Sequence, residues 1–249
     1  MGDISRRFDN GESKAMKHVL ITRFALRWPE GHPRRKWEQR PGWVQYRMEL
    51  FRKYCLPSVQ AQTFKDFDWW FLVNFNFPGF MNKTTNELNR YGTCKFMTES
   101  WSEEQPGVGA AFSEYYKDEW VCSTRIDSDD IMRNDFMERV HALATEEDAW
   151  IGFRNGYMMK DDRIAAKKFL CNPFMSHVEY ASPFKSVFHL SHKRVYRDGG
   201  LFKKIDDVPG WIQVDHSDNV KNLVGRKIHD FEAESVPAST VYEDFTWNR

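Results

Sequence analysis

The 249-residue sequence predicts an α/β fold: a mixed, mainly parallel sheet flanked by helices, with a smaller β-rich region in the second half. Over residues 18–145, β-favouring and helical stretches alternate, which is typical of parallel βαβ units with right-handed crossovers. Over residues 146–249, strand and turn signals predominate. Because no Pro/Ser-rich linker separates these halves, we expect residues 18–249 to form one domain after a mobile polar leader at 1–17.

The elements of the first half follow from local composition. The run HVLITRFAL at 18–26 predicts the first strand. Residues 27–42 contain three prolines, two glycines and six basic residues, which predicts a loop. A helix is expected over 43–54, and a second short helix is expected to begin at Pro57, since proline suits a first helical turn. The remaining expected elements are a strand at 67–75, a helix at 84–91, a strand at 94–98 and a helix at 107–117.

The stretch from Trp120 to Val140 carries the strongest functional signal. It opens with β-favouring residues, continues with Asp127, Asp129 and Asp130, and ends with apolar residues at helical spacing. This pattern predicts a strand, an acidic turn and a helix. Ligands of open α/β sheets bind at the carboxyl ends of strands, where the turn would lie. Clustered carboxylates repel one another unless they are solvated or a hard cation such as Mg²⁺ or Mn²⁺ neutralises them.

Three interpretations of the acidic turn compete. It could simply be the acidic N-terminus of the next helix, where aspartate caps free N–H groups and favours the dipole. A calcium-binding loop is excluded, because Ile131 and Met132 stand where that loop needs a ligand and a glycine. In the third interpretation, a metal bridges the carboxylates to a diphosphate and takes up charge as the diphosphate leaves.

The second half predicts short strands and turns. Strand-like residues at 149–154 precede Asn155-Gly156, a strong hairpin-turn signal, and residues 157–160 would form the returning strand. A third strand is expected within 163–170. The expected elements after it are an aromatic loop at 174–188, a strand at 187–190, a helix around 192–197 and a short apolar segment, GWIQVDHSDN, at 210–219.

Composition excludes several classes of partner and protein. Lys plus Arg and Asp plus Glu both number 36, which argues against nucleic acid or an anionic membrane as the main partner. The four cysteines form no C-x-x-C pair, so we expect reduced thiols and a cytoplasmic location. No run is long and apolar enough to predict an integral membrane segment. A dehydrogenase or an ATPase is set aside, because neither Gly-rich phosphate motif is present.

Five segments together resemble the glycosyltransferases of the GT-A fold, and more narrowly their rhamnosyltransferase group. They are TRF at 22–24, PSVQAQTFKDFDWWFLV at 57–73, RIDSDD at 125–130, FRNGY at 153–157 and WIQVDHSDN at 211–219. The resemblance implies a metal-dependent hexosyltransferase. Its donor would be a UDP-, dTDP- or GDP-sugar, and its acceptor would be a hydroxyl of a glycan or other glycoconjugate.

The same resemblance implies roles for individual residues. Asp129 and His216 would hold Mn²⁺ or Mg²⁺, and Asp127 would contact the metal, its bound water or the donor ribose. The remaining donor-binding residues would be Thr22 beside the base, Arg23 and Arg125 near the base or diphosphate, and Asn219 near phosphate.

The catalytic base stays open at this point. The turn Gly199-Gly200-Leu201-Phe202 lacks the Glu-Asp pair often found after such a turn in inverting enzymes, which leaves Asp206, Asp207 and Asp215 as candidates. A retaining reaction would need no such base. Two other functions remain as alternatives: a carbohydrate-binding module or inactive transferase relic, which the 16% aromatic content would suit, and a sugar nucleotidyltransferase, whose Gly-rich, Lys-containing loop is missing.

Overall fold

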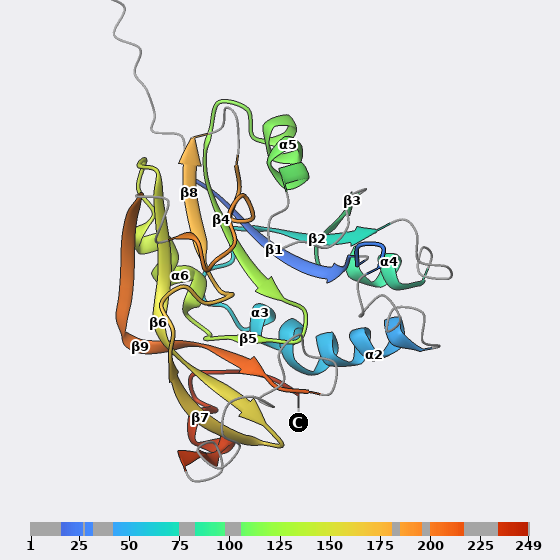
Figure 1. Ribbon diagram of the computed structural model, residues 1–249, viewed down its shortest axis with the longest axis vertical. Coiled ribbons are helices and arrows are strands. Elements are labelled where there is room, and N and C mark those ends of the chain that lie inside the picture. Colours follow the sequence, from blue (N-terminus) through green and yellow to red (C-terminus); the bar gives the residue numbers. More distant parts are fainter. Residues whose placement is uncertain are drawn as a thin grey trace, which may run out of the picture.

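The computed structural model describes residues 16–26, 28–31, 42–74, 83–97, 106–180, 185–195, 200–216 and 234–248. Its strands form one ten-stranded sheet, in which the main path runs β10-β7-β6-β8-β4-β1-β2-β3 (Figure 1). Strand β9 pairs with β6 and with the short strand β5 beside this path. The mixed α/β fold class predicted from the sequence is therefore confirmed.

The first half supplies the parallel part of the sheet. Strand β1 (Lys17–Ala25) lies between β4 (Trp120–Asp127) and β2 (Asp68–Asn74), and β3 (Thr93–Met97) pairs with β2 at the edge. All three pairings are parallel, as the alternation of strands and helices predicted. Parallel strands end at the same edge, so the carboxyl ends of β1 and β4 lie side by side.

The second half extends the sheet mainly through antiparallel pairs. Strand β8 (Ser176–Tyr180) joins β4 to β6 (Ala149–Lys160), and β7 (Arg163–Lys168) returns beside β6. The long β9 (Leu201–Val214) runs parallel to β6. Two short strands complete the described sheet, β5 (Ile131–Met132) against β9 and β10 (Val236–Pro237) against β7.

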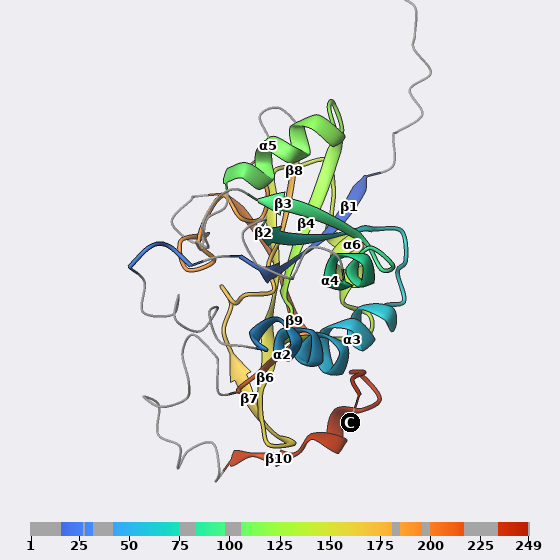
Figure 2. The same cartoon turned by 90° about the vertical axis from the view of Figure 1, so that its right-hand side faces the viewer.

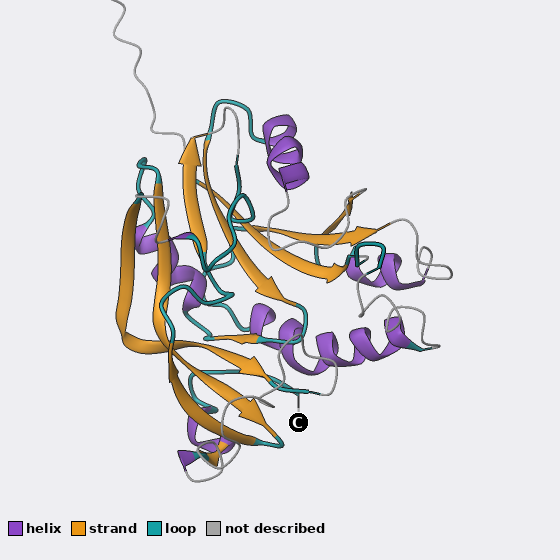
Figure 3. Ribbon diagram, viewed as in Figure 1, coloured by secondary structure: helices purple, strands orange, loops and turns teal. Residues whose placement is uncertain are grey.

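Helices cover both faces of the parallel part (Figure 3). On β1, Leu20 and Phe24 pack into one core cluster, whereas Val19 and Ile21 pack into the cluster on the opposite face, as strand alternation requires. The first cluster includes residues of α2, α3, α4 and α6, and the second includes residues of α5. The helical segments are α2 (Trp43–Leu50), η1 (Phe51–Cys55), α3 (Leu56–Gln60), α4 (Lys83–Leu88), α5 (Pro106–Tyr115), α6 (Phe136–Leu143) and the 3₁₀ turn η3 (Ala238–Val241).

The short helix predicted to begin at Pro57 is confirmed as α3, which has Pro57 in its first turn, but the prediction that it stands apart from the preceding helix is wrong. Residues 43–60 form one continuous helix, whose middle turn, Phe51–Cys55, widens to π-helical geometry. Proline has no N–H to donate to the carbonyl four residues earlier, which belongs to Lys53. That carbonyl instead accepts the N–H of Asn248 at 2.7 Å, and the Asn248 amide donates to the Arg52 carbonyl at 2.8 Å. The C-terminal segment, which lies below the helix in Figure 2, therefore supplies the missing hydrogen bonds.

The hairpin predicted at Asn155-Gly156 is also wrong. Strand β6 runs through both residues, and the turn lies at Asp161-Asp162, both of which have positive φ. A Cβ atom on Gly156 would lie 2.2 Å from Trp211 Cδ2, so this glycine makes room for a buried indole rather than for a turn.

Two further differences concern the segment after β7. Residues 187–190, expected as a strand, form turns, and the aromatic loop expected over 174–188 contains β8. The leader expected at 1–17 lies almost wholly outside the described residues, and the division at residue 145 stays a prediction. The first core cluster nevertheless combines Leu20 and Phe71 with Phe153 and Trp211, which come from both halves.

Candidate functional site

The carboxyl ends of β1 and β4 bring the first two site residues together. Arg23 and Asp127 are direct partners in the parallel β1–β4 register. The Arg23 Nη2 donates to Asp127 Oδ1 at 2.8 Å and to Oδ2 at 3.1 Å, and Nε donates to Oδ1 at 3.1 Å. The Arg23 side chain is largely buried, so this fork-like pair is sheltered from solvent. Local sheet geometry therefore produces the first charge pair of the site.

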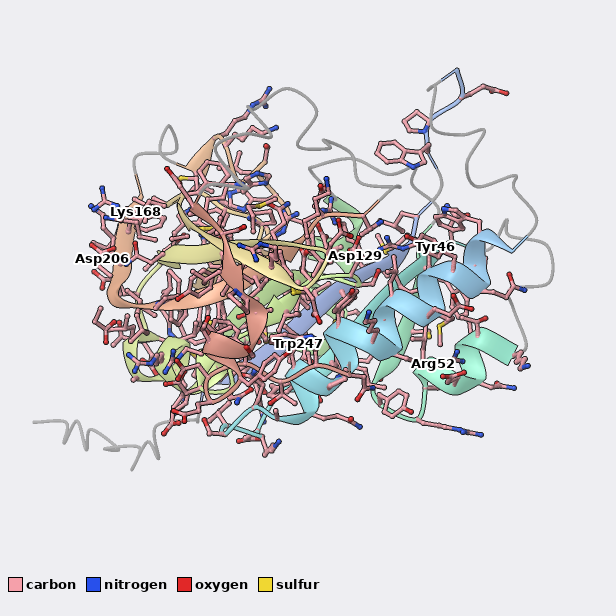
Figure 4. The ribbon with its side chains drawn as sticks, turned by 90° about the horizontal axis from the view of Figure 1, so that it is seen from below. Tyr46, Arg52, Asp129, Lys168, Asp206 and Trp247 are labelled. Carbon is pink, nitrogen blue, oxygen red and sulfur yellow. The ribbon has the colours of Figure 1, made fainter. Side chains whose placement is uncertain are left out.

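A second charge pair joins the acidic turn to α2. Arg47 donates to both carboxylate oxygens of Asp129, at 2.9 and 3.1 Å, and also to the Ser128 hydroxyl. The Oδ2 atom that accepts from Arg47 Nη1 also lies 2.6 Å from His216 Nε2. The ring of His216 is held in turn by Tyr46, whose hydroxyl lies 3.3 Å from Nδ1. Figure 4 shows Asp129 beside Tyr46 and α2.

The third carboxylate of the turn has a structural partner. Asp130 is buried, and its Oδ1 accepts the backbone N–H of Val214 at 3.0 Å. Its own N–H donates to the Asp127 carbonyl at 3.2 Å, which closes the turn. Val214 is the last residue of β9, two positions before His216. Asp130 therefore anchors the strand end that delivers His216 to the acidic turn.

Burial and charge act differently on the neighbouring carboxyls. Burial alone would raise the pKa of Asp129, but the Arg47 charge and the hydrogen bonds from His216 and Arg47 outweigh it and hold that pKa well below its usual range. For Asp130, burial and the charges of Asp129 and Asp127 act together and raise the pKa well above its usual range. The turn therefore holds one carboxyl whose pKa is lowered and one whose pKa is raised.

The other expected donor-binding residues lie in different surroundings. Thr22 is fully buried, and its hydroxyl accepts a hydrogen bond from Trp69 Nε1 at 2.9 Å, so it faces the core. Arg125 is 1% exposed, and its guanidinium carbon lies 4.8 Å from the centroid of the Phe188 ring. Arg23 approaches the same ring at 5.4 Å. Asn219 lies outside the described residues. The structure thus groups Arg23 and Arg125 around one aromatic ring and keeps Thr22 inside.

The three candidates for the base are separated. Asp207 is exposed and pairs with Arg139 of α6 at 2.8 Å. In Figure 4, Asp206 is labelled at the left end of the view, whereas Asp129 is labelled near its middle. Asp215 directly precedes His216, and its Oδ1 is buried without a hydrogen-bond partner. Burial raises the pKa of Asp215, against the opposing charges of Lys160 and His216. Of the three, only Asp215 directly precedes a residue that contacts the acidic turn, His216.

Two side chains near the turn carry atoms of the types that bind divalent cations. Asp129 Oδ2 and His216 Nε2 lie 2.6 Å apart, and carboxylate oxygen and imidazole nitrogen are both ligand types that Mn²⁺ accepts. Within the described ranges, no group of three or more His, Cys, Asp or Glu side chains converges on one point.

Sequence reasoning missed Arg47 and its neighbour Tyr46. A signal was present, because Arg47 lies four residues after Trp43 and four before Phe51, on the stripe that packs against the core. An arginine in such a stripe must find a carboxylate or another acceptor. Which carboxylate it meets depends on the packing of α2 against β4.

Comparisons with known proteins give one family and several distant structures. A family model described as putative rhamnosyl transferase matches residues 17–227. None of the curated proteins matches the chain. In the described parts of the chain, no helix combines the length and apolar character of a membrane span.

Similar solved structures include TarS 1–349 of S. aureus in complex with UDP (10% identity, TM-score 0.49), and its complex with UDP-GlcNAc (12%, 0.47). These alignments cover 80% and 88% of this chain, but 60% and 64% of the TarS chains, which is less than two thirds of their length. The inositol-1-phosphate CTP transferase of T. maritima is 13% identical with a TM-score of 0.41, over 89% of this chain and 96% of that one.

Proposed function

Because the chain belongs to the putative rhamnosyl transferase family, we propose that it is a glycosyltransferase. It moves a hexose from a nucleoside-diphosphate sugar, with UDP, dTDP or GDP as the nucleotide, to a hydroxyl of a glycan or other glycoconjugate. The observation that carries this proposal is the meeting of Asp129 and His216, 87 positions apart in sequence, at the carboxyl edge of the sheet. Ligands of open α/β sheets bind at this edge.

Each residue at this edge has a proposed role that follows from its chemistry. Asp129 and His216 would hold a divalent cation, Mn²⁺ or Mg²⁺, and this cation would supply positive charge to stabilise the diphosphate as a leaving group. Arg23, held in place by Asp127, presents its guanidinium beside the donor phosphates. Tyr46 orients the His216 ring through Nδ1, which leaves Nε2 directed at Asp129. Asp130 keeps the end of β9 in position.

Asp215 is our proposed base for an inverting transfer. A base works best when its pKa lies near the working pH, and burial moves the pKa of Asp215 upward, towards that range. Asp207 lacks this environment, since it is exposed and paired with Arg139. We expect Asp215→Asn to lower kcat by about 10²- to 10⁴-fold, as loss of a general base usually does, and Asp207→Asn to keep near-normal turnover. Equal losses in the two variants would refute this assignment.

A thermal-shift panel tests the donor site directly. UDP, GDP, dTDP, CDP and ADP are each added with Mn²⁺ or with EDTA, and a ligand that binds only the native state raises the unfolding midpoint. We expect one nucleotide to raise it, and only with Mn²⁺. The variant Asp129→Asn should lose this shift. A shift with free oligosaccharides but with no nucleotide would instead support a carbohydrate-binding module.

A further inference from the structure

Arg47 occupies the carboxylate that a divalent cation would need. It donates to both oxygens of Asp129, and the two side chains are only 13% and 14% exposed. The Ser128 hydroxyl fixes the same guanidinium from the side. A planar guanidinium bound to both oxygens of one carboxylate covers the edge from which a cation would approach. Arg47 and a cation therefore compete for Asp129.

The balance of charges at the site also disfavours binding of a cation alone. The structure pairs Asp127 with Arg23 and Asp129 with Arg47, so each of these two carboxylates already has one matching positive charge. A divalent cation added to this balanced set would leave uncompensated positive charge in a partly buried place, which is costly. The diphosphate of a donor would supply the missing negative charge. Cation and nucleotide should therefore bind together much better than either binds alone.

We propose that Arg47 neutralises the Asp129 carboxylate in the free enzyme. When a cation binds Asp129, the Arg47 guanidinium would move to the donor diphosphate. This inference rests on the proposed function, because it names how the same site is filled. A guanidinium suits both positions, since its fork matches phosphate oxygens as well as carboxylate oxygens. Arg47 thereby makes cation binding conditional on the donor.

The experiment measures Mn²⁺ binding by the electron paramagnetic resonance signal of the free ion, first with Mn²⁺ alone. Arg47→Met removes the competing charge and keeps an unbranched side chain. Arg52→Met is the matched control, because Arg52 lies five positions later in the same continuous helix and pairs with Glu87 at an exposed place. We expect Arg47→Met to bind Mn²⁺ about 5- to 150-fold more tightly than wild type, the usual range for coupled sites. Arg52→Met should behave as wild type.

A second measurement adds the nucleotide selected by the thermal-shift panel. In wild type, the nucleotide should tighten Mn²⁺ binding, and in Arg47→Met this gain should be smaller, because no displaced guanidinium contributes to it. If Arg47→Met does not fold, Arg47→Lys is measured instead. Lysine keeps the positive charge but cannot bind both oxygens of Asp129, so we expect Mn²⁺ to bind this variant more tightly than wild type, by a smaller factor. Wild-type affinity for Mn²⁺ alone in a folded Arg47 variant would overturn the inference.

Asp129→Asn separates failure of this inference from failure of the proposed function. If nucleotide-dependent Mn²⁺ binding disappears in Asp129→Asn but Arg47→Met resembles wild type, the cation site stands and only the role of Arg47 is overturned. If wild type binds no Mn²⁺ with any nucleotide of the panel, both are overturned.

Discussion

Gly156→Ala should destabilise the protein far more than an ordinary surface substitution would. The new Cβ atom would lie 2.2, 2.3 and 2.6 Å from Cδ2, Cε2 and Cε3 of Trp211. Non-bonded carbon atoms prefer about 3.5–4.0 Å, so the indole would have to shift by roughly 1 Å or more. Trp211 is fully buried, stacks on Phe174 at 5.5 Å between ring centroids, and donates its Nε1–H to the Phe153 carbonyl at 3.2 Å. A shift of this size disturbs the packing of the indole, its stacking on Phe174 and its hydrogen bond to Phe153.

The expected cost is the sum of two known effects. Overpacking a tight core costs about 1–3 kcal/mol, and loss of a buried hydrogen bond adds roughly 1 kcal/mol. We therefore expect the free energy of unfolding to fall by about 3 kcal/mol. In a domain of this size, that corresponds to a drop of roughly 6–12 °C in the melting temperature. Urea denaturation followed by tryptophan fluorescence and by circular dichroism measures the change.

Gly152→Ala is the matched control on the same strand. There the nearest atom to a new Cβ is Met175 Sδ at 3.0 Å, at the flexible end of a side chain that can adjust. We expect this variant to lose less than about 1 kcal/mol. Similar losses in the two variants would refute the argument that close contact with Trp211 is the reason for a glycine at 156.

Two other predictions concern the buried polar side chains of Asp130 and His18. Asp130→Ala should lower the free energy of unfolding by about 1–3 kcal/mol, because the buried Val214 N–H loses its acceptor. Asp130→Asn keeps an oxygen at this position and should cost less. Equal losses of unfolding free energy in the two variants, measured by urea denaturation, would contradict the anchoring role of Asp130. Burial and the neighbouring His141 lower the pKa of His18 from 6.5 to about 4, so the unfolded chain binds more protons between these values. Stability contributed by neutral His18 should be present above pH 6.5 and lost as pH falls towards 4, by up to roughly 3 kcal/mol, and His18→Leu should flatten this part of the pH profile. An unchanged profile in that variant would contradict the assignment to His18.

Sequence reasoning predicted the parallel half of the sheet well because its signals are local. The residues of β1, β2 and β4 are β-favouring runs bounded by polar segments, and their burial on both faces leaves little choice of conformation. The acidic turn after β4 was predicted for the same reason, since a β-favouring run gives way there to polar and acidic residues. Its position at the ligand-binding edge then follows from the parallel topology.

Local signals misled where a distant partner decided the conformation. Asn155-Gly156 has the composition of a tight turn, but the glycine is needed under Trp211, a residue 55 positions later. Pro57 has the composition of a helix start, but Asn248 accommodates it within a continuous helix by binding the freed carbonyl. Neither partner is visible in a window around the residue concerned.

Local sequence patterns predicted the α/β class, the order of the first strands and the acidic turn, whereas the pairing of Asp129 with His216 was implied by the family resemblance. Only the tertiary structure decided which groups meet there: Arg23 on Asp127, Arg47 on Asp129, and Val214 on Asp130. The physical reason is the separation in sequence between the interacting residues. Strand and turn preferences depend on neighbours in sequence, whereas the partner of a buried charge depends on how helices and strands far apart in the chain pack together.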